Sequence, residues 1–376
     1  MRRVAIVLVA LCALLPGELI GQNSIYGIRG LGFPGRWTTA RGRALGGGPG
    51  AFDPVSPINP AGVAAFPRVT VLAGASTDLR GYTVGDVSVD GLRATRFPLL
   101  LIGGRAGSLP IGFAVSYAQY TERSYDVTLA DTIDLRGVPV AVTDRTISQG
   151  GVSDLRGAVG VLVSPRLRLG VAVHMLSGSA KLSLSRQFAD SAYRPYRVTS
   201  EDRTKGLGFS AGVVWAPLAG VQLGLAARTD TKADIEVDST PQGTVNLPTT
   251  LVAGLELAPI PALRWSATGI WRSWSDADPD LAARAFDTWE IGTGLELGGA
   301  ETGASRVPLR LGFRYATLPF APADDQPHEI TLAIGTGLTF AGNRALLDVA
   351  LERAMRNGGG ASERAWQLSW TMTVRP

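Results

Sequence analysis

Cysteine and histidine are almost missing from this 376-residue chain, which contains one cysteine and two histidines. The cysteine, Cys12, lies in an apolar stretch at the N-terminus, so removal of that stretch would leave no disulfide and no thiolate site. For His174 and His328 we expect neither a partner acid nor a second ligand at metal spacing, and we interpret both as lumen-facing or loop-end polar residues. We therefore expect no catalytic residues, no metal site and no cofactor, and a protein that is not an enzyme.

Charged residues and long apolar runs are also scarce. Only 18% of the residues are charged and the formal net charge is +4, whereas soluble domains typically contain ~25% charged residues. This mild, evenly spread charge argues against nucleic acid as a partner. After the N-terminus, no run approaches the ~18 apolar residues of a membrane-spanning helix. If the chain crosses a bilayer, it must do so with strands.

Residues 1–21 have the organisation of a secretory signal peptide. Arg2 and Arg3 precede an apolar core at residues 4–15, and a Pro-Gly pair follows it. We expect cleavage near residues 21–22, which removes Arg2, Arg3 and Glu18 and lowers the formal net charge from +4 to +3.

What the chain has in abundance is alternation with a period of two. Between Leu167 and Met175 the odd-numbered positions are apolar, while Arg168, Gly170 and His174 fall between them. Successive side chains of a strand point to opposite faces, so each such segment has one apolar face and one small or polar face. We predict fourteen strands, at residues 69–80, 94–104, 110–123, 153–164, 167–178, 204–216, 220–233, 249–258, 262–274, 286–297, 306–317, 328–340, 344–355 and 364–375.

The strand lengths and the connections indicate a membrane barrel. Transmembrane β-strands need ~9–11 residues, and bacterial barrels have an even number of strands. Tight connections alternate with long polar ones at 124–152, 179–203 and 234–248, as periplasmic turns alternate with extracellular loops. We predict an all-β fold: a transmembrane antiparallel barrel of about fourteen strands at 69–376, with both termini periplasmic. Aromatic belts are expected at both interfaces; the residues assigned to the loop side are Phe97, Tyr117, Tyr120, Trp271, Phe286, Trp289 and Tyr315.

Two short motifs resemble catalytic or phosphate-binding signatures but lack the required context. Residues 30–35 match GxGxxG, yet they follow no strand and open no helix, which argues against phosphate binding. Residues 208–212 match GxSxG, but they lie within a strand rather than at a strand-to-helix turn, so we interpret Ser210 as a small lumen residue. An outer-membrane enzyme would need a Ser–His–acid cluster, which two isolated histidines hardly supply.

Charged residues of the strands fall on the face opposite the apolar one. An Arg or Lys facing lipid would cost ~2–4 kcal/mol at the bilayer midplane, so these side chains must point into the lumen. They form either a mutually compensating network that holds the barrel and a plug together or the polar lining of a permeation path. The lumen-facing candidates are Arg156, Arg168, His174, Arg228, Glu256, Arg264, Arg272, Glu290, Glu296, Arg310, Arg314, Asp348 and Glu352, with Gln222 beside them.

Residues 40–64 resemble the N-terminal signature of the FadL-like outer-membrane transporters. Residues 40–51 include the glycine-rich stretch Ala-Leu-Gly-Gly-Gly-Pro-Gly at 44–50, and the motif Asn59, Pro60, Ala61 and Gly62 follows just before the first strand. The resemblance covers essentially the whole mature chain. It implies a fourteen-stranded barrel closed from inside by an N-terminal hatch, at residues 22–68, and uptake of long-chain fatty acids or other hydrophobic compounds.

We therefore expect passive uptake of a hydrophobic small molecule across the bacterial outer membrane. The alternative is a non-transporting structural or secretion-associated barrel that binds a protein partner. Expected partners are the hydrophobic ligand, outer-membrane lipid and the barrel-assembly machinery, and we expect a monomer.

The hatch should be packed against glycine-lined wall. A segment of ~47 residues this rich in Gly and Pro cannot build its own core, so it must fold against the barrel. We expect Asn59, Pro60 and Ala61 to form a tight turn inside the barrel, with the Asn59 side chain hydrogen-bonded to nearby backbone; the alternative is a periplasmic linker leading into the first strand. The inward glycines that would allow close approach are Gly170, Gly208, Gly212, Gly224, Gly254, Gly292, Gly294, Gly312, Gly335 and Gly337.

Overall fold

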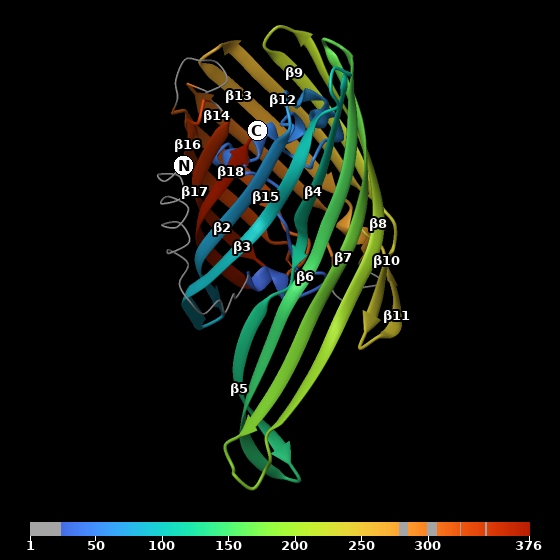
Figure 1. Ribbon diagram of the computed structural model, residues 1–376. Coiled ribbons are helices and arrows are strands. Elements are labelled where there is room, and N and C mark those ends of the chain that lie inside the picture. The colour runs from blue at the N-terminus through green and yellow to red at the C-terminus, as the bar shows by residue number, and fades with distance from the viewer. Residues whose placement is uncertain (1–23, 278–284, 299–306, 324, 343) are drawn as a thin grey trace.

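Fourteen antiparallel strands close into a barrel in the computed structural model, which describes residues 24–277, 285–298, 307–323, 325–342 and 344–376 (Figure 1). The expected signal peptide lies outside these residues. Within the described part of the chain, no helix is long and apolar enough to span a membrane. The wall consists of β2 (Thr70–Val84), β3 (Val87–Arg105), β4 (Ile111–Glu122), β6 (Val138–Ser164), β7 (Leu167–Phe188), β8 (Tyr196–Leu218), β9 (Val221–Asp230), β12 (Thr250–Ile260), β13 (Leu263–Arg272), β14 (Thr288–Leu297), β15 (Leu309–Thr317), β16 (His328–Phe340), β17 (Ala345–Gly358) and β18 (Ala361–Val374).

The barrel closes where the last strand pairs with the first strand of the wall. β18 pairs with β2 in an antiparallel register that runs from Val374 opposite Val71 to Ala361 opposite Val84. The predicted number of strands and their order along the wall are confirmed. The predicted bounds of β16, residues 328–340, agree with the structure.

Three connections predicted as long polar loops are strands instead, which corrects the sequence prediction. β6, β7 and β8 continue well past the predicted strand ends, and β5 (Tyr125–Leu135) pairs along the extension of β6. β10 (Ala233–Val237) and β11 (Thr240–Val245) form a further hairpin beside β8. Figure 1 shows the ends of β5–β8 projecting beyond the barrel. Apolar residues alternate in parts of the extension, as at Val127, Leu129 and Ile133, but charged residues such as Asp131 interrupt the pattern. The backbone pairing of β5 with β6 shows that these residues are strands.

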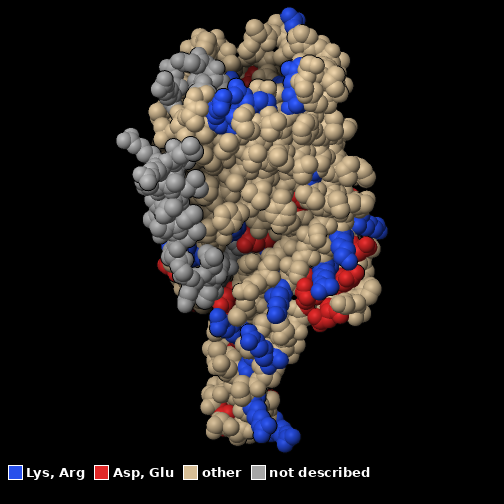
Figure 2. Space-filling view, viewed as in Figure 1, with Lys and Arg blue, Asp and Glu red and all other residues tan. Residues whose placement is uncertain are grey.

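Burial alternates along the wall as the sequence pattern requires. Val171 and Val173 are 61% and 47% exposed on the outer face of β7, whereas Ala172 between them is 5% exposed. Figure 2 shows the same division on one face of the molecule: uncharged residues cover the middle, while basic and acidic side chains gather toward the rim and the extension. Apolar side chains exposed in a band of this kind are expected to face hydrocarbon.

Residues 24–69, called here the N-terminal segment, pack against the inner face of the barrel. The segment contains η1 (Ile25–Gly27), β1 (Phe33–Pro34), α2 (Ala40–Ala44), η2 (Gly48–Ala51) and η3 (Pro60–Ala65). The helix α2 contacts β15–β18, η2 contacts β12–β14 and η3 contacts β4 and β6–β8. Contacts thus reach most of the circumference, and the segment occupies the space that a hollow barrel would leave open.

Candidate functional site

Inward-facing glycines allow the N-terminal segment to lie directly on the wall. A Cβ built on Gly170 would stand 2.4 Å from the carbonyl carbon of Pro60, and one on Gly312 would stand 2.3 Å from the backbone nitrogen of Gly46. Both positions therefore exclude any larger residue unless the segment moves. Two of the predicted inward glycines do not contact the segment: Gly208 faces the Asp230 carboxylate and Gly337 faces the Asp348 carboxylate, both on the wall. The other predicted glycines that lie against the segment are Gly212, Gly224, Gly254, Gly292, Gly294 and Gly335.

Asn59 joins the segment to the barrel at the start of η3. Its Oδ1 accepts a hydrogen bond from the Ala61 backbone N–H at 3.0 Å, which caps the short helix. Its Nδ2 lies 2.9 Å from the Ala51 carbonyl oxygen and 3.2 Å from the Val213 carbonyl oxygen on β8. The residue is buried, with Pro60 following at the first helical position. The predicted side-chain bonding of Asn59 to nearby backbone is present in the structure, in a turn that opens η3.

Arginines of the N-terminal segment bind carboxylates of the wall. Arg36 and Arg43 lie 2.8 Å and 3.0 Å from the two carboxylate oxygens of Glu352, which is fully buried. Arg41 contacts both oxygens of Glu296, at 3.0 Å and 3.1 Å. Buried charges persist only when they are paired and hydrogen-bonded, so these contacts fix where the segment can lie.

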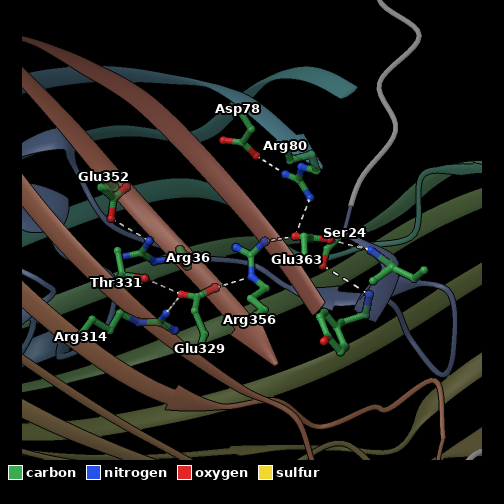
Figure 3. A network of polar contacts seen from close by, with 12 residues as sticks. Ser24, Arg36, Asp78, Arg80, Arg314, Glu329, Thr331, Glu352, Arg356 and Glu363 are labelled. Atoms are coloured by element: carbon green, nitrogen blue, oxygen red, sulfur yellow. Dashed lines mark hydrogen bonds and ion pairs between the residues drawn. The ribbon is translucent and has the colours of Figure 1, made fainter. Parts of the chain in front are cut away.

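A second network joins strands at the end of the barrel from which β5–β8 project, and Figure 3 shows its residues. Glu329 accepts hydrogen bonds from Arg314 and from Arg356 Nε, the latter at 2.5 Å, and Arg356 also contacts Glu363. Glu363 accepts a bond from the Ile25 backbone N–H at 3.0 Å. Tyr26, beside them, donates to the Ala361 carbonyl at 2.6 Å, and burial next to Glu363 raises the pKa of its hydroxyl above its usual range. The network therefore ties η1 to β16–β18.

All thirteen predicted lumen residues are buried or half-buried, but they form separate groups. Arg310 bridges Glu296 and Asp348 at 2.7 Å and 2.6 Å. Glu290 accepts from Arg314 at 2.7 Å and from Arg272 at 3.3 Å. Two further groups contain the remaining members. Arg168, Glu256 and Arg264 lie around Gln222 at the end of the barrel opposite the extension. A group on β6–β9 contains Arg156, His174 and Arg228.

The expectation that His174 has no acid partner is wrong. Its Nδ1 lies 2.9 Å from Asp154 Oδ2, and its Nε2 lies 2.9 Å from Ser210 Oγ. The three residues are on adjacent strands, so no linear spacing in the sequence could reveal them. His328, by contrast, lies at the loop end of β16 and stacks on Tyr315 with ring centroids 6.2 Å apart.

Sequence analysis missed several members of the networks. Arg356 and Glu363 fell outside the predicted ends of their strands, although they continue the same inward alternation. Tyr120 was assigned to the outer aromatic belt but points inward, stacked on Trp37 at 5.7 Å. It continues the buried, even-numbered face of β4 that includes Ser116 and Ala118, so regular alternation already places it inside. Asp78, Arg80, Arg96, Glu122 and Glu329 lie within predicted strands but were not included among the lumen-facing candidates, although all five are buried or half-buried.

Part of the wall is completed by the N-terminal segment itself. β3 pairs with β4 only from Leu99 opposite Ala118 to Arg105 opposite Gly112. Beyond Ala118, β4 pairs with β1, with Pro34 opposite Thr121. An Arg96–Glu122 ion pair links β3 to β4 where their backbone pairing ends. Beyond Leu99 and Ala118, β3 and β4 are therefore joined by a side-chain ion pair rather than by backbone hydrogen bonds.

Two cavities lie at opposite ends of the interior. A cavity of about 260 Å³ is lined by Leu31, Arg123, Asp202 and residues 242–245, near the extension formed by β5–β8. A cavity of about 470 Å³ at the opposite end is lined by residues of the N-terminal segment and by wall residues that include Arg168, Glu256 and Arg310.

These features define a closed outer-membrane-type β-barrel of fourteen strands with an occupied lumen. No protein-family model matches the chain, and no curated protein matches its sequence. Among solved structures, it is similar to a FadL homologue from Pseudomonas aeruginosa, with a TM-score of 0.62 and 15% identity over 92% of this chain and 99% of that one. It is also similar to the Ralstonia pickettii toluene transporter TbuX (TM-score 0.61, 16% identity, 91% and 99% covered) and the Pseudomonas putida toluene transporter TodX (0.62, 14%, 92% and 99%). The likeness establishes a shared fold.

Proposed function

We propose that this protein is an outer-membrane channel for passive uptake of hydrophobic small molecules, such as long-chain fatty acids, and that residues 22–68 act as its hatch. The observation that carries the proposal is the N-terminal segment, which fills the barrel between a cavity near the extracellular end and a larger periplasmic one. The shared fold with toluene transporters supports a hydrophobic cargo. In this proposal, movement of the hatch connects the two cavities.

The proposal includes an export and assembly route. Residues 1–21 direct secretion and are removed, the barrel-assembly machinery inserts the strands, and the monomer is surrounded by outer-membrane lipid. The exposed apolar residues of the wall support that last contact, because leaving so many in water would be costly.

Reconstitution in lipid vesicles tests uptake directly. We expect radiolabelled toluene or oleate to show saturable binding to the purified protein and to enter protein-containing vesicles faster than protein-free ones. Absence of saturable binding for both compounds, with a correctly folded barrel, contradicts the proposal.

The extracellular extension supports a second candidate, a barrel that binds a protein partner. β5 pairs with β6 on one side only within the described residues, so its other edge presents unpaired backbone groups. Affinity purification from cross-linked cells, with and without residues 130–143, would detect such a partner. Loss of a specific protein on deletion, together with no ligand binding, would favour this function over uptake.

A further inference from the structure

A hydrogen-bonded chain of serine, histidine and aspartate lies inside the barrel. Ser210 Oγ is 2.9 Å from His174 Nε2, and His174 Nδ1 is 2.9 Å and 3.1 Å from the two oxygens of Asp154. All three side chains are buried. A carboxylate at Nδ1 favours the tautomer that carries its proton there, which leaves Nε2 free to accept the proton of the serine hydroxyl.

The wall register sets this geometry. Ala172 on β7 is opposite both Ala158 on β6 and Ser210 on β8, while His174 is two residues farther along β7 on the same inward face. Ser210 and His174 are therefore diagonal neighbours, as are His174 and Asp154, which is opposite Leu176. Diagonal pairs on one face of a sheet are close enough for long or aromatic side chains to meet.

Two guanidinium groups beside the Ser210–His174–Asp154 chain have nitrogen donors without a hydrogen-bond partner among the described residues. Arg228 is opposite Ser210 in the register and binds Asp154 at 2.6 Å, yet its Nη2 is buried without a hydrogen-bond partner among the described residues. Arg156 is opposite His174, and within the same described part of the chain none of its three guanidinium nitrogens has a partner. These donors make the surroundings of Ser210 suited to a negatively charged oxygen.

Ser210, His174 and Arg228 line one small cavity. Its volume is about 10 Å³, and Trp37 and Ile58 of the N-terminal segment form part of its wall. Such a space accommodates about one water molecule. The ring of Trp37 also covers Arg228, with the guanidinium carbon 5.2 Å from the ring centroid. A larger group can reach the serine only when this part of the segment moves.

We propose that Ser210 is a nucleophile for acyl transfer from short-chain carboxylic esters, with His174 as general base and acid. Ser210 Oγ attacks the ester carbonyl carbon while its proton moves to His174 Nε2, and Arg228 stabilises the carbonyl oxygen as it becomes negative. Cleavage of the bond between the carbonyl carbon and the alkoxy oxygen releases an alcohol, which takes the proton from Nε2. Water then attacks the acyl-serine with the same proton transfers, releasing a carboxylic acid and restoring Ser210. Asp154 acts as a positioning residue that holds His174.

This activity goes beyond uptake and does not depend on it, because the purified protein can be tested without transport. We expect a fluorophosphonate probe to label the folded wild-type barrel at Ser210, identified by mass spectrometry, and Ser210→Ala to lose the label. His174→Gln should slow labelling about 100-fold or more, the usual size of a general-base effect. Ser369→Ala is the matched control, since Ser369 is a buried serine bonded to Ser76 Oγ, and it should label within about twofold of wild type.

A second variant separates the access of a probe to Ser210 from the reactivity of the Ser210 hydroxyl. Trp37→Ala enlarges the cavity, so it should increase the labelling rate and the release of p-nitrophenol from p-nitrophenyl acetate. A downfield Nδ1 proton resonance of His174, present in wild type and lost in Asp154→Asn, would support the positioning role. Ser210 is not a nucleophile if folded wild type and folded Trp37→Ala both remain unlabelled, or if Ser210→Ala labels as wild type does. In either case the hydrogen bonds among Ser210, His174 and Asp154 have a structural role only.

Discussion

Glu352 neutralises two arginines of the N-terminal segment, Arg36 and Arg43. Its charge should therefore contribute more to the stability of the protein than the charge of an ordinary surface carboxylate. Glu352→Gln keeps the shape but leaves Arg36 and Arg43 buried without their counter-charge. Breaking a buried ion pair typically costs about 3–5 kcal/mol. We expect a loss of that order in the free energy of unfolding, measured by urea titration of tryptophan fluorescence in lipid vesicles.

An exposed carboxylate supplies the control for Glu352. Glu201 pairs with Arg203 at 3.2 Å on the extension beyond the barrel, where both side chains are exposed to solvent. Exposed pairs contribute little because water and salt screen them. Glu201→Gln should therefore leave the urea midpoint unchanged, and equal midpoints for the two variants would contradict the role assigned to Glu352.

Asn59 is the residue at which sequence motif and structure agree most closely. Asn59→Ala removes the cap of η3 and the contacts with the Ala51 and Val213 carbonyls. Loss of a helix cap costs about 0.5–2 kcal/mol. The barrel should still show heat-modifiable migration on a gel, while the N-terminal segment becomes more susceptible to proteases. Unchanged protease resistance would show that Asn59 does not hold the segment.

At the scale of whole elements, glycines decide whether the segment and the wall can touch. Gly170→Ala would force a methyl group against the Pro60 backbone at 2.4 Å, so η3 must shift. Gly157→Ala is the matched control, because no atom lies within 4 Å of its added Cβ. We expect faster proteolysis of the N-terminal segment, and a higher single-channel conductance, for Gly170→Ala only.

The number and order of the wall strands could be predicted because lipid outside and polar groups inside impose a period of two. That constraint ends where the strands leave the bilayer, so the ends of β6–β8 and the whole of β5 were read as loops. Alternation also predicted which charged residues face inward. It could not predict their partners, because pairing such as His174 with Asp154 depends on the stagger between neighbouring strands.

The N-terminal segment could be placed only in outline. Its glycine content and the motif at Asn59 indicated a plug, but Arg36, Arg41 and Arg43 carry no periodic signal. Their partners are wall carboxylates 255–316 residues away in the chain. Contacts of such long range are consequences of barrel closure, and no local pattern encodes them.

For the molecule as a whole, the barrel and its contents should be separable. The wall is a continuous hydrogen-bonded ring from β2 to β18, so deletion of residues 40–62 should leave it assembled. We expect this variant to form a conducting pore in planar bilayers and to change the rate of ligand uptake. Conductance and uptake that both stay at wild-type values would contradict the hatch.

A deletion of similar kind outside the barrel provides the comparison. Removing residues 130–143 shortens the β5–β6 hairpin to the paired residues Leu129 and Asp144 and leaves the interior untouched. This variant should conduct as wild type does. Equal conductance in both deletions would mean that pore opening reflects general damage to the protein.

The distance along the chain between the segment and its partners also sets an order in time. Residues 24–69 leave the ribosome before the strands of the wall, yet Arg41 can meet Glu296 only after β14 exists, and Arg36 can meet Glu352 only after β17 exists. The segment cannot hold its position until nearly the entire sequence has been synthesised and the ring has formed around it. This segment, made before the wall, is therefore the last part of the protein to reach its final position. Until then its glycines and arginines are accessible to the proteins that accompany the chain to the membrane.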